Sequence, residues 1–265
     1  MLNITLVNPP GFSGGSGLPL ELAQVGAVLE RDGHRVSLVD AVLSRLQPGD
    51  IPASLSVPEL VIIEASTHAI GNSLRTAEAI REQFPAVCVI LFGEHPTVRL
   101  QETLEASEAV NCIIRGEPEE TIFETCRAVY EQASLADIRG ISYRDGDRIV
   151  HNPARAGLVA MDALPFPAWH LCELKKYRYE PPQGKSSPAI EVMTSRGTLS
   201  PAAWRSEAPY GAAFREKSED RVIDELIYVK ERFHAKEIIF TDEWFLHDGE
   251  RVRRLCERMM KVGLK

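Results

Sequence analysis

Short apolar runs alternate with longer amphipathic stretches over the first half of the chain. The runs are apolar almost throughout, which is typical of parallel strands covered on both faces. The stretches between them have the spacing of helices that bury one face. This alternation predicts a doubly wound α/β sheet with right-handed crossovers. The expected strands are residues 2–8, 35–39, 59–64, 87–92 and 111–114, and the expected helices are residues 20–31, 73–83, 99–106 and 119–132, with a short helix and a loop over 41–58.

The pattern changes after the last of these helices. Residues 138–150 read as a hairpin around the turn Asp145-Gly146-Asp147. Residues 152–188 are irregular and rich in proline and aromatic side chains, which is typical of a linker strapped to a surface. A second α/β stretch follows, with strands expected at 189–195 and 237–241 and helices at 221–233 and 249–262. We therefore expect three parts, which are a domain over 1–135, a hairpin and linker over 136–188, and an α/β unit over 189–265.

Composition narrows the class of protein. The chain has 265 residues, and its 38 acidic and 30 basic side chains give a net charge of −8. A nucleic-acid-binding domain would normally carry a basic face, so no nucleic-acid partner is expected. No apolar run approaches the roughly 18 residues of a membrane span, and the amino terminus lacks the basic flank of a secretory signal. Five widely spaced cysteines form no disulfide framework, which predicts a cytoplasmic protein without a membrane span.

Small, hydroxyl-bearing and glycine residues follow four of the five expected strands. Ligands of parallel sheets bind beyond the carboxyl ends of the strands. The proline- and glycine-rich loop after the first strand can approach a bulky ligand, although it matches neither a Walker A motif nor G-x-G-x-x-G. Helix N-capping alone would explain Ser66, Thr67 and Thr97, but the set together favours a binding site. The candidates are Asn8, Pro9, Pro10, Ser66, Thr67, Gly93, Glu94, His95, Pro96, Thr97, Gly116 and Glu117.

Six short motifs follow one another along the chain. They are Asn8-Pro9-Pro10, Gly93-Glu94-His95-Pro96-Thr97, Arg115-Gly116-Glu117, the linker segment 164–169 with Tyr177 after it, Thr194-Ser195-Arg196-Gly197, and the segment 240–245. In this order they resemble the motifs of cobalamin-dependent radical SAM enzymes. The resemblance implies a flavodoxin-like (Rossmann-like), five-stranded cobalamin-binding domain over 1–135. It also implies that 189–265 is the start of a radical SAM (β/α) barrel, truncated after its first βα units.

The resemblance further implies that cobalamin lies over the strand ends, with its nucleotide tail among the sheet loops. It assigns the cofactor contacts to the twelve candidate residues, whose backbone N–H groups and hydroxyls suit amides and a phosphate. A histidine below the cobalt would belong to a D-x-H-x-x-G motif after the first strand, and that loop contains no histidine. We therefore expect base-off cobalamin without a protein ligand. His68, in the segment 66–71, is the alternative lower ligand.

The chain departs from the family where a 4Fe–4S cluster would bind. Radical SAM enzymes hold the cluster with C-x3-C-x2-C, because iron–sulfur clusters need thiolate ligands. The matching positions are Thr198, Ala202 and Arg205, and no cysteine lies nearby. Alanine has no ligand atom, and arginine is a cation that only donates hydrogen bonds. We expect no cluster here, and hence no chelation of S-adenosylmethionine by its open iron.

Three hypotheses remain open. The first is a cobalamin-binding protein of the family, which methylates or cyclises by radical chemistry, with this chain inactive in that chemistry. The second is a fragment of a working enzyme whose barrel is completed elsewhere. The third is a non-enzymatic dimerisation or regulatory module, because an incomplete barrel leaves a strand edge for a second copy or a barrel-completing partner.

Several other polar residues receive structural interpretations. The pair Asp242-Glu243 is expected to cap the following helix rather than act as an acid–base pair or bind S-adenosylmethionine. Four cysteines lie in expected strands or helices and are interpreted as core residues, whereas Cys172 in the linker is the candidate for exposure. No role is assigned to His170 or His247. The four core cysteines are Cys88, Cys112, Cys126 and Cys256.

Overall fold

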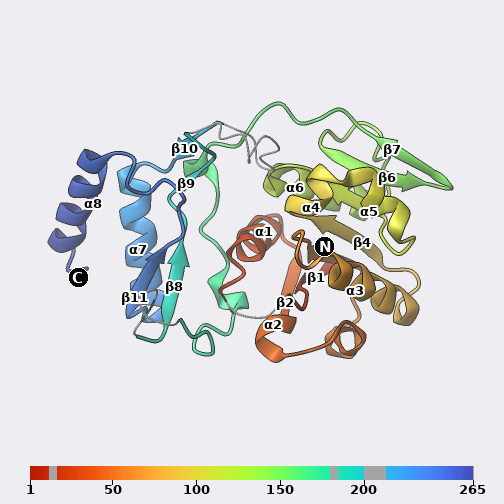
Figure 1. Cartoon of the computed structure of the whole chain (residues 1–265), viewed down its shortest axis with the longest axis horizontal. Coiled ribbons are helices and arrows are strands. Elements are labelled where there is room, and N and C mark those ends of the chain that lie inside the picture. The colour runs from red at the N-terminus through yellow and green to blue at the C-terminus, as the bar shows by residue number, and fades with distance from the viewer. Residues whose placement is uncertain (12–16, 180–183, 185, 200–212, 265) are drawn as a thin grey trace.

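The computed structural model describes residues 1–11, 17–179, 184, 186–199 and 213–264. Its largest sheet has seven strands in the order β2-β1-β3-β4-β5-β6-β7 (Figure 1). The first five are parallel to their neighbours, and their order 2-1-3-4-5 is that of flavodoxin-like folds. The strands are β1 (Asn3–Asn8), β2 (Arg35–Asp40), β3 (Leu60–Glu64), β4 (Cys88–Phe92), β5 (Cys112–Ile114), β6 (Ile141–Asp145) and β7 (Arg148–His151).

The prediction of a doubly wound α/β sheet is confirmed, but the expected five strands are too few. The predicted hairpin forms, and its first strand pairs antiparallel with β5, so that Ile141 lies opposite Ile114. Asp145 and Arg148 close the hairpin turn. A parallel sheet that ended at β5 would leave a row of unpaired N–H and C=O groups, and β6 supplies their partners. The hairpin therefore extends the sheet.

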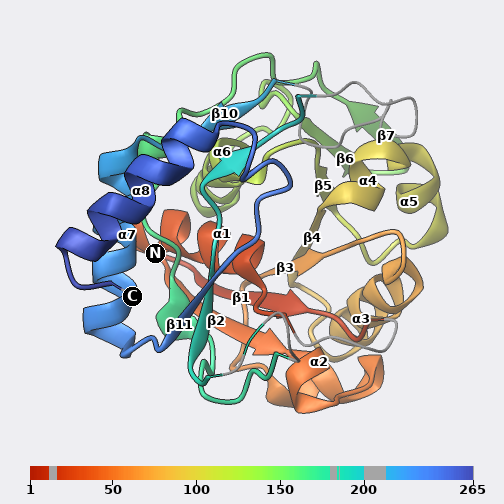
Figure 2. The same ribbon diagram turned by 60° about the vertical axis from the view of Figure 1, so that its left-hand side comes forward.

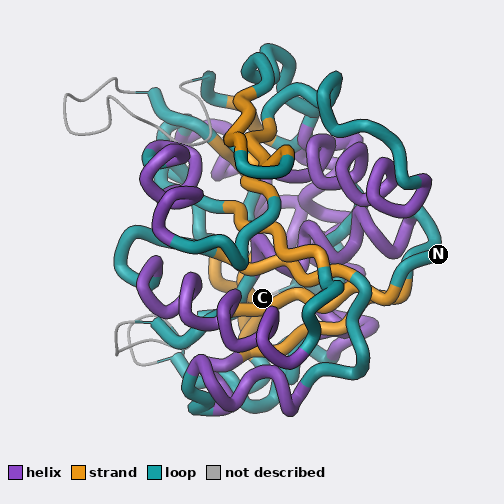
Figure 3. Tube along the Cα trace, turned by 90° about the vertical axis from the view of Figure 1, so that its right-hand side faces the viewer, coloured by secondary structure: helices purple, strands orange, loops and turns teal. Residues whose placement is uncertain are grey.

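Helices cover both faces of the sheet (Figure 3). In β3, Leu60 and Ile62 pack in the core beneath α1 and α6, and Val61 and Ile63 pack in the core beneath α3 and α5. Burial of both faces explains why the parallel strands are apolar throughout. The helices of this part are α1 (Leu20–Arg31), α2 (Ala41–Ser44), α3 (Ile70–Gln83), α4 (Glu94–Val98), α5 (Leu100–Ala106) and α6 (Pro118–Glu131), with 3-10 turns at Pro48–Ser54, Met161–Ala163 and Trp169–Leu171.

Helix α1 is buried on two sides, because it lies between the large sheet and the second α/β unit (Figure 1). The Ala168 N–H of the linker donates a hydrogen bond of 2.9 Å to the Ala23 carbonyl of α1. A Cβ added at Gly26 would lie 2.7 Å from Leu171 Cδ1, so glycine permits this close approach. The linker is thus packed against α1 by both hydrogen bonds and side chains.

The second α/β unit packs against the linker and the start of α1. Its two parallel strands lie side by side, with two helices beside them (Figure 2). Trp169 and Tyr177 of the linker are 0% and 1% exposed in the apolar core shared with this unit. The expected strand 189–195 is broken into two. The elements are β8 (Ala189–Val192), β9 (Ser195–Arg196), β10 (Arg215–Glu216), α7 (Glu219–Phe233), β11 (Glu237–Phe240) and α8 (Gly249–Lys261).

In the described part of the chain, no helix has the length and apolar character needed to cross a bilayer.

Candidate functional site

The carboxyl ends of β1, β3, β4 and β5 meet at one edge of the sheet. Val7 lies opposite Ile63, and Leu91 lies opposite Ile113, so the loops that follow these strands are neighbours. The side-chain amide of Asn72 in α3 donates to the Pro10 carbonyl at 2.6 Å and so connects the first of these loops to α3. The structure therefore brings the predicted residues from all four loops to the same edge of the sheet.

A close backbone approach joins the loops after β3 and β4. Gly93 has a φ of +121°, and a Cβ at this position would lie 2.9 Å from the Ala65 carbonyl oxygen. The His95 N–H donates to the same oxygen at 3.2 Å. Only glycine fits this conformation and this spacing without strain. Glycine at position 93 therefore permits the loops after β3 and β4 to touch.

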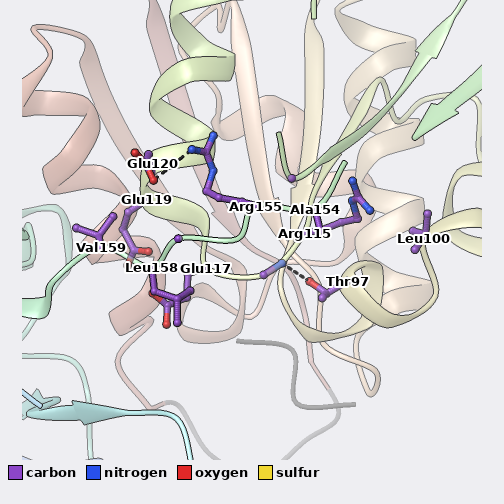
Figure 4. A pocket seen from close by; sticks show the side chains of 13 residues that line it. Thr97, Leu100, Arg115, Glu117, Glu119, Glu120, Ala154, Arg155, Leu158 and Val159 are labelled. Atoms are coloured by element: carbon purple, nitrogen blue, oxygen red, sulfur yellow. Dashed lines mark hydrogen bonds and ion pairs between the residues drawn. The ribbon is translucent and has the colours of Figure 1, made fainter. Parts of the chain in front are cut away.

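Thr97 joins the loops after β4 and β5. Its hydroxyl donates to the Gly93 carbonyl at 2.7 Å and accepts from the Gly116 N–H at 3.1 Å (Figure 4). This side chain therefore fixes two of the predicted loops relative to each other. The role of these residues in a binding site stays a prediction.

The predicted residues differ in their exposure. Thr67 and Glu94 are exposed, whereas Pro9 and Pro96 are buried. The remaining candidates in these loops, other than buried Gly93, are partly buried. His68 is also exposed. Among the candidates, the exposed side chains are therefore those of Thr67 after β3 and Glu94 after β4.

His95 has a polar atom that its described neighbours do not satisfy. Its Nδ1 is buried without a hydrogen-bond partner among the residues that the structure describes. Burial lowers the pKa of the His95 imidazole, which keeps the ring uncharged near neutral pH. A buried neutral nitrogen without a described partner is suited to a hydrogen bond with a ligand.

Two acidic residues that sequence analysis passed over end β2 and β3. Asp40 is buried, and its carboxylate accepts hydrogen bonds from the Asn8 side chain at 3.0 Å and from the Tyr177 hydroxyl at 2.7 Å. Burial, with the charges of Glu21 and Asp40, raises the pKa of Glu64 to about 8. Their position as the last residue of a strand was the available signal in the sequence.

A cavity of about 290 Å³ opens between the loop after β5 and the segment that follows β7 (Figure 4). Three predicted residues line it, namely Thr97, Gly116 and Glu117. Arg115 and Arg155, which were not predicted, line it as well. Arg155 pairs with Glu120 at 3.2 Å, and so the cavity wall is polar on this side.

The carboxylate of Glu117 is directed towards the second α/β unit. It lies 3.6 Å from the Arg196 guanidinium, contacts Arg215, and is 7% exposed. Burial raises the pKa of Glu117, and the two arginines oppose this shift. The Gly116 N–H is therefore bonded to Thr97, while the Glu117 side chain belongs to an ionic cluster.

The three positions that match iron–sulfur cluster ligands, 198, 202 and 205, carry no thiolate side chain. Thr198 is described and carries a hydroxyl, whereas Ala202 and Arg205 lie outside the described residues. Within the described ranges, no group of three or more His, Cys, Asp or Glu side chains is arranged to hold a metal ion. Burial raises the pKa of Cys88 to about 11 and that of Cys172 to about 12, and also raises the pKa of the thiols of Cys112 and Cys126. These four thiols are therefore protonated at neutral pH.

Asp242 has a different role from the one expected. Its carboxylate accepts from the Thr194 N–H at 2.9 Å and from the hydroxyls of Thr194 and Ser195 at 2.8 and 2.5 Å. The next described helix, α8, is capped by Asp248. The capping interpretation of Asp242 is wrong, because the parallel pairing of β8 and β11 places its side chain beside the turn between β8 and β9.

Two cysteine interpretations are also wrong. Cys172 is 8% exposed, because the linker packs against the core of the second unit. Cys256 is exposed, because it lies on the outer face of α8. The histidines without an assigned role make surface contacts, as His170 lies 2.9 Å from Glu30 and His247 lies 3.4 Å from Glu216.

No family model matches the chain. It is 29% identical over 273 residues to an uncharacterised methyltransferase of Pyrococcus horikoshii, covering 100% of this chain and 58% of that protein. It is 26% identical over 252 residues to the anaerobic magnesium-protoporphyrin IX monomethyl ester cyclase of Synechocystis sp., covering 91% of this chain and 50% of the cyclase. The chain thus spans about half the length of these curated relatives.

Solved structures share its fold. The cobalamin-dependent S-adenosylmethionine radical enzyme OxsB, with aqua-cobalamin and S-adenosylmethionine bound, matches with a TM-score of 0.77 at 18% identity over 98% of this chain and 37% of that chain. The radical S-adenosylmethionine methyltransferase TsrM from Kitasatospora setae, with cobalamin and a [4Fe-4S] cluster bound, matches with a TM-score of 0.72 at 17% identity, covering 98% of this chain and 51% of that chain.

Proposed function

We propose a function from the premise that the chain belongs to the cobalamin-dependent radical SAM methyltransferases and cyclases, of which it spans about half the length. In this proposal the chain binds cobalamin at the carboxyl edge of its large sheet and is inactive in radical chemistry. Cobalamin, when bound, supplies the capacity to carry a methyl group, while the protein supplies binding and orientation.

The observation that carries this proposal is the meeting of four loops at the carboxyl edge of the sheet. Gly93 lacks a Cβ where the loops after β3 and β4 touch, and Thr97 ties the loop after β4 to Gly116. The macrocycle is proposed to lie over these joined loops, where the exposed Thr67 side chain suits its amide groups. The residues that would hold cobalamin are Asn8, Pro9, Pro10, Ser66, Thr67, Gly93, Glu94, His95, Pro96, Thr97, Gly116 and the backbone of Glu117.

The lower face of the cobalt is proposed to have no protein ligand. His68 is exposed and follows β3, so it is the alternative ligand in this loop. His95 follows β4, and its buried Nδ1 is proposed to form a hydrogen bond with the cofactor rather than to bind the cobalt. The three parts proposed for the chain are the cobalamin-binding domain 1–135, the hairpin and linker 136–188, and the start of a barrel 189–265.

The residues at the cluster positions do not fit an iron–sulfur cluster. Threonine, alanine and arginine replace three thiolates at 198, 202 and 205. We therefore derive no step through a cluster or through S-adenosylmethionine. The alternative is that the chain is part of a working enzyme of the family, since its relatives are about twice as long.

Anaerobic reconstitution with iron and sulfide tests the inactive assignment. The unmodified chain is expected to gain no stoichiometric iron, because it lacks the three thiolates. The variant Thr198→Cys/Ala202→Cys/Arg205→Cys is the control that restores the ligand types. Iron and sulfide at cluster stoichiometry in the unmodified chain would contradict the proposal.

A blocking substitution tests the cobalamin site. Thr67→Arg places a long cation over the strand ends at an exposed position, where little stability depends on the hydroxyl. Equilibrium dialysis is expected to show at least tenfold weaker hydroxocobalamin binding. Ala86→Arg is the matched control, because Ala86 is exposed in the turn before β4, at the opposite end of the sheet. If hydroxocobalamin binding is weakened equally in both variants, or is unchanged in both, this edge of the sheet is not the cobalamin site.

A further inference from the structure

An ionic cluster joins the loop after β5 to two strands of the second unit. The Arg196 guanidinium of β9 lies 2.7 Å from Glu119 and 3.6 Å from Glu117. Arg215 of β10 contacts the other oxygen of Glu117 and donates to the Val159 carbonyl at 2.8 Å. One carboxylate, that of Glu117, is therefore shared between two strands that are separated in the sequence.

The cluster is shielded from solvent. The side chains of Glu117, Glu119 and Arg196 are 7%, 3% and 11% exposed, and that of Arg215 is 20% exposed. The carboxylates of Glu117 and Glu119 face these two guanidinium groups, and the charge of Glu21 also acts on Arg196. Buried charges are strongly unfavourable unless they keep their partners, and Arg–carboxylate pairs are directional. The cluster therefore favours one position of β9 and β10 relative to the large sheet.

Strands β9 and β10 are also held to each other by contacts that do not involve Glu117. They pair antiparallel, with Arg215 opposite Arg196. Gly197 has a φ of +89°, and a Cβ there would lie 2.2 Å from the Ala213 carbonyl oxygen, so the strands touch at this point. The Lys217 N–H donates to the Thr194 carbonyl at 2.8 Å. A displacement of one strand must therefore move the other.

The residue before Glu117 belongs to the proposed site. The Gly116 N–H donates to Thr97, which also holds the loop after β4. Gly116 and Glu117 line the cavity described above, together with Val159. The Gly116 N–H, which bonds Thr97, and the Glu117 carboxylate, which pairs with Arg196 and Arg215, thus belong to consecutive residues.

We propose that Glu117 is a positioning residue that couples cobalamin binding at the edge of the large sheet to the placement of β9 and β10. This inference rests on the proposed function, because it takes the loop after β5 as part of the cobalamin site. Coupling between two sites is reciprocal in free energy. Cobalamin therefore stabilises the β9–β10 pair through Glu117, and loss of the ion pairs weakens cobalamin binding.

Amide hydrogen exchange of the full chain tests the coupling. In the unliganded protein, Glu117→Gln keeps the side-chain size but removes the charge, and exchange in peptides over 195–199 and 213–219 is expected to accelerate at least tenfold. Saturating hydroxocobalamin is expected to slow these peptides at least threefold in the unmodified chain and not in Glu117→Gln. Hydroxocobalamin should also bind Glu117→Gln about tenfold more weakly.

Two further variants serve as controls. Glu120→Gln removes a carboxylate three residues after Glu117 that pairs with Arg155, and it is expected to leave exchange of β9 and β10 unchanged. Arg215→Lys keeps the charge near Glu117 and is expected to give intermediate exchange. If Glu117→Gln exchanges like an unfolded chain throughout, Arg215→Lys decides the question. Slowing of β9 and β10 by hydroxocobalamin that is smaller than in the unmodified chain supports the coupling, and equal slowing overturns it.

The outcomes separate this inference from the proposed function. If the unmodified chain binds no hydroxocobalamin, the proposed function and the coupling both fail, whereas faster exchange in unliganded Glu117→Gln would still assign the ion pairs their positioning role. If cobalamin binds but does not slow exchange of β9 and β10, the coupling is overturned and the proposed function stands. Unchanged exchange in unliganded Glu117→Gln would overturn the positioning role.

Discussion

Replacing Trp169 with alanine is expected to lower the free energy of unfolding by about 3–5 kcal/mol. The indole is fully buried where the linker meets the second unit. Its ring lies 6.2 Å from those of Tyr228 and Phe233, and its N–H donates to the Glu191 carbonyl at 3.3 Å. The substitution removes these contacts, leaves a cavity and leaves the Glu191 carbonyl without this donor.

Urea denaturation followed by far-ultraviolet circular dichroism measures this change without relying on tryptophan fluorescence. Leu246→Ala is the control, because this side chain is also large and apolar but is 77% exposed. It is expected to change the free energy of unfolding by less than about 0.5 kcal/mol. A loss below about 1 kcal/mol in Trp169→Ala would show that the linker is not part of a shared core.

The stability of the chain is expected to fall as the pH rises from about 5 to about 8, because Glu64 loses its proton. Burial and the neighbouring acids raise the pKa of folded Glu64 to about 8, from an ordinary value of 4.5. The folded state therefore holds the proton more tightly than the unfolded state. This contribution is complete below the unfolded pKa and is lost as the pH rises through the folded pKa.

Glu64→Gln removes this titration and keeps the shape of a protonated carboxyl group. At pH 9 the variant is expected to be more stable than the unmodified chain by on the order of 2 kcal/mol, after allowance for partial exposure of the group. Thermal unfolding at pH 5 and pH 9 compares the two proteins. The exposed Glu78 on α3 offers the control Glu78→Gln. An equal pH dependence in all three proteins would show that Glu64 ionises normally.

Local patterns predicted most of the helices and strands, because the spacing of apolar residues within a segment indicates which of the two it forms. The helix over 20–31 was predicted with the observed bounds, and the parallel strands were predicted to within one or two residues. Burial of both sheet faces makes such runs unmistakable in a sequence. The strand expected over 189–195 was broken in the structure, because it changes partner from β11 to β10 after Val192.

Tertiary contacts could not be predicted in the same way. Nothing local marks the antiparallel pairing of β6 with β5, which adds the hairpin to the sheet. The spacing between Glu117 and Arg215 in the sequence does not reveal that they form an ion pair. Asp242 was interpreted from the helix that follows it, although its partners are Thr194 in the turn after β8 and Ser195 at the start of β9.

The candidate site was predictable as a set of loops but not as a set of contacts. The rule that ligands bind at strand ends selected these loops, and the parallel strands bring them to one edge, while their role in binding stays a prediction. The same rule does not tell which side chains face a ligand. Thr97 holds two loops and Glu117 faces the second unit, and both roles depend on distances across the sheet.

Cobalamin retention is the most direct test of the account. The purified chain would be incubated with hydroxocobalamin, desalted, and examined for the amount and absorbance spectrum of the corrin that stays bound. We predict close to one corrin per chain, with the base-off spectrum of cobalt that has no histidine ligand. A histidine-ligated spectrum would contradict the assignment of the lower face and indicate His68. A chain that emerges without corrin would contradict the central claim and favour a dimerisation or regulatory module.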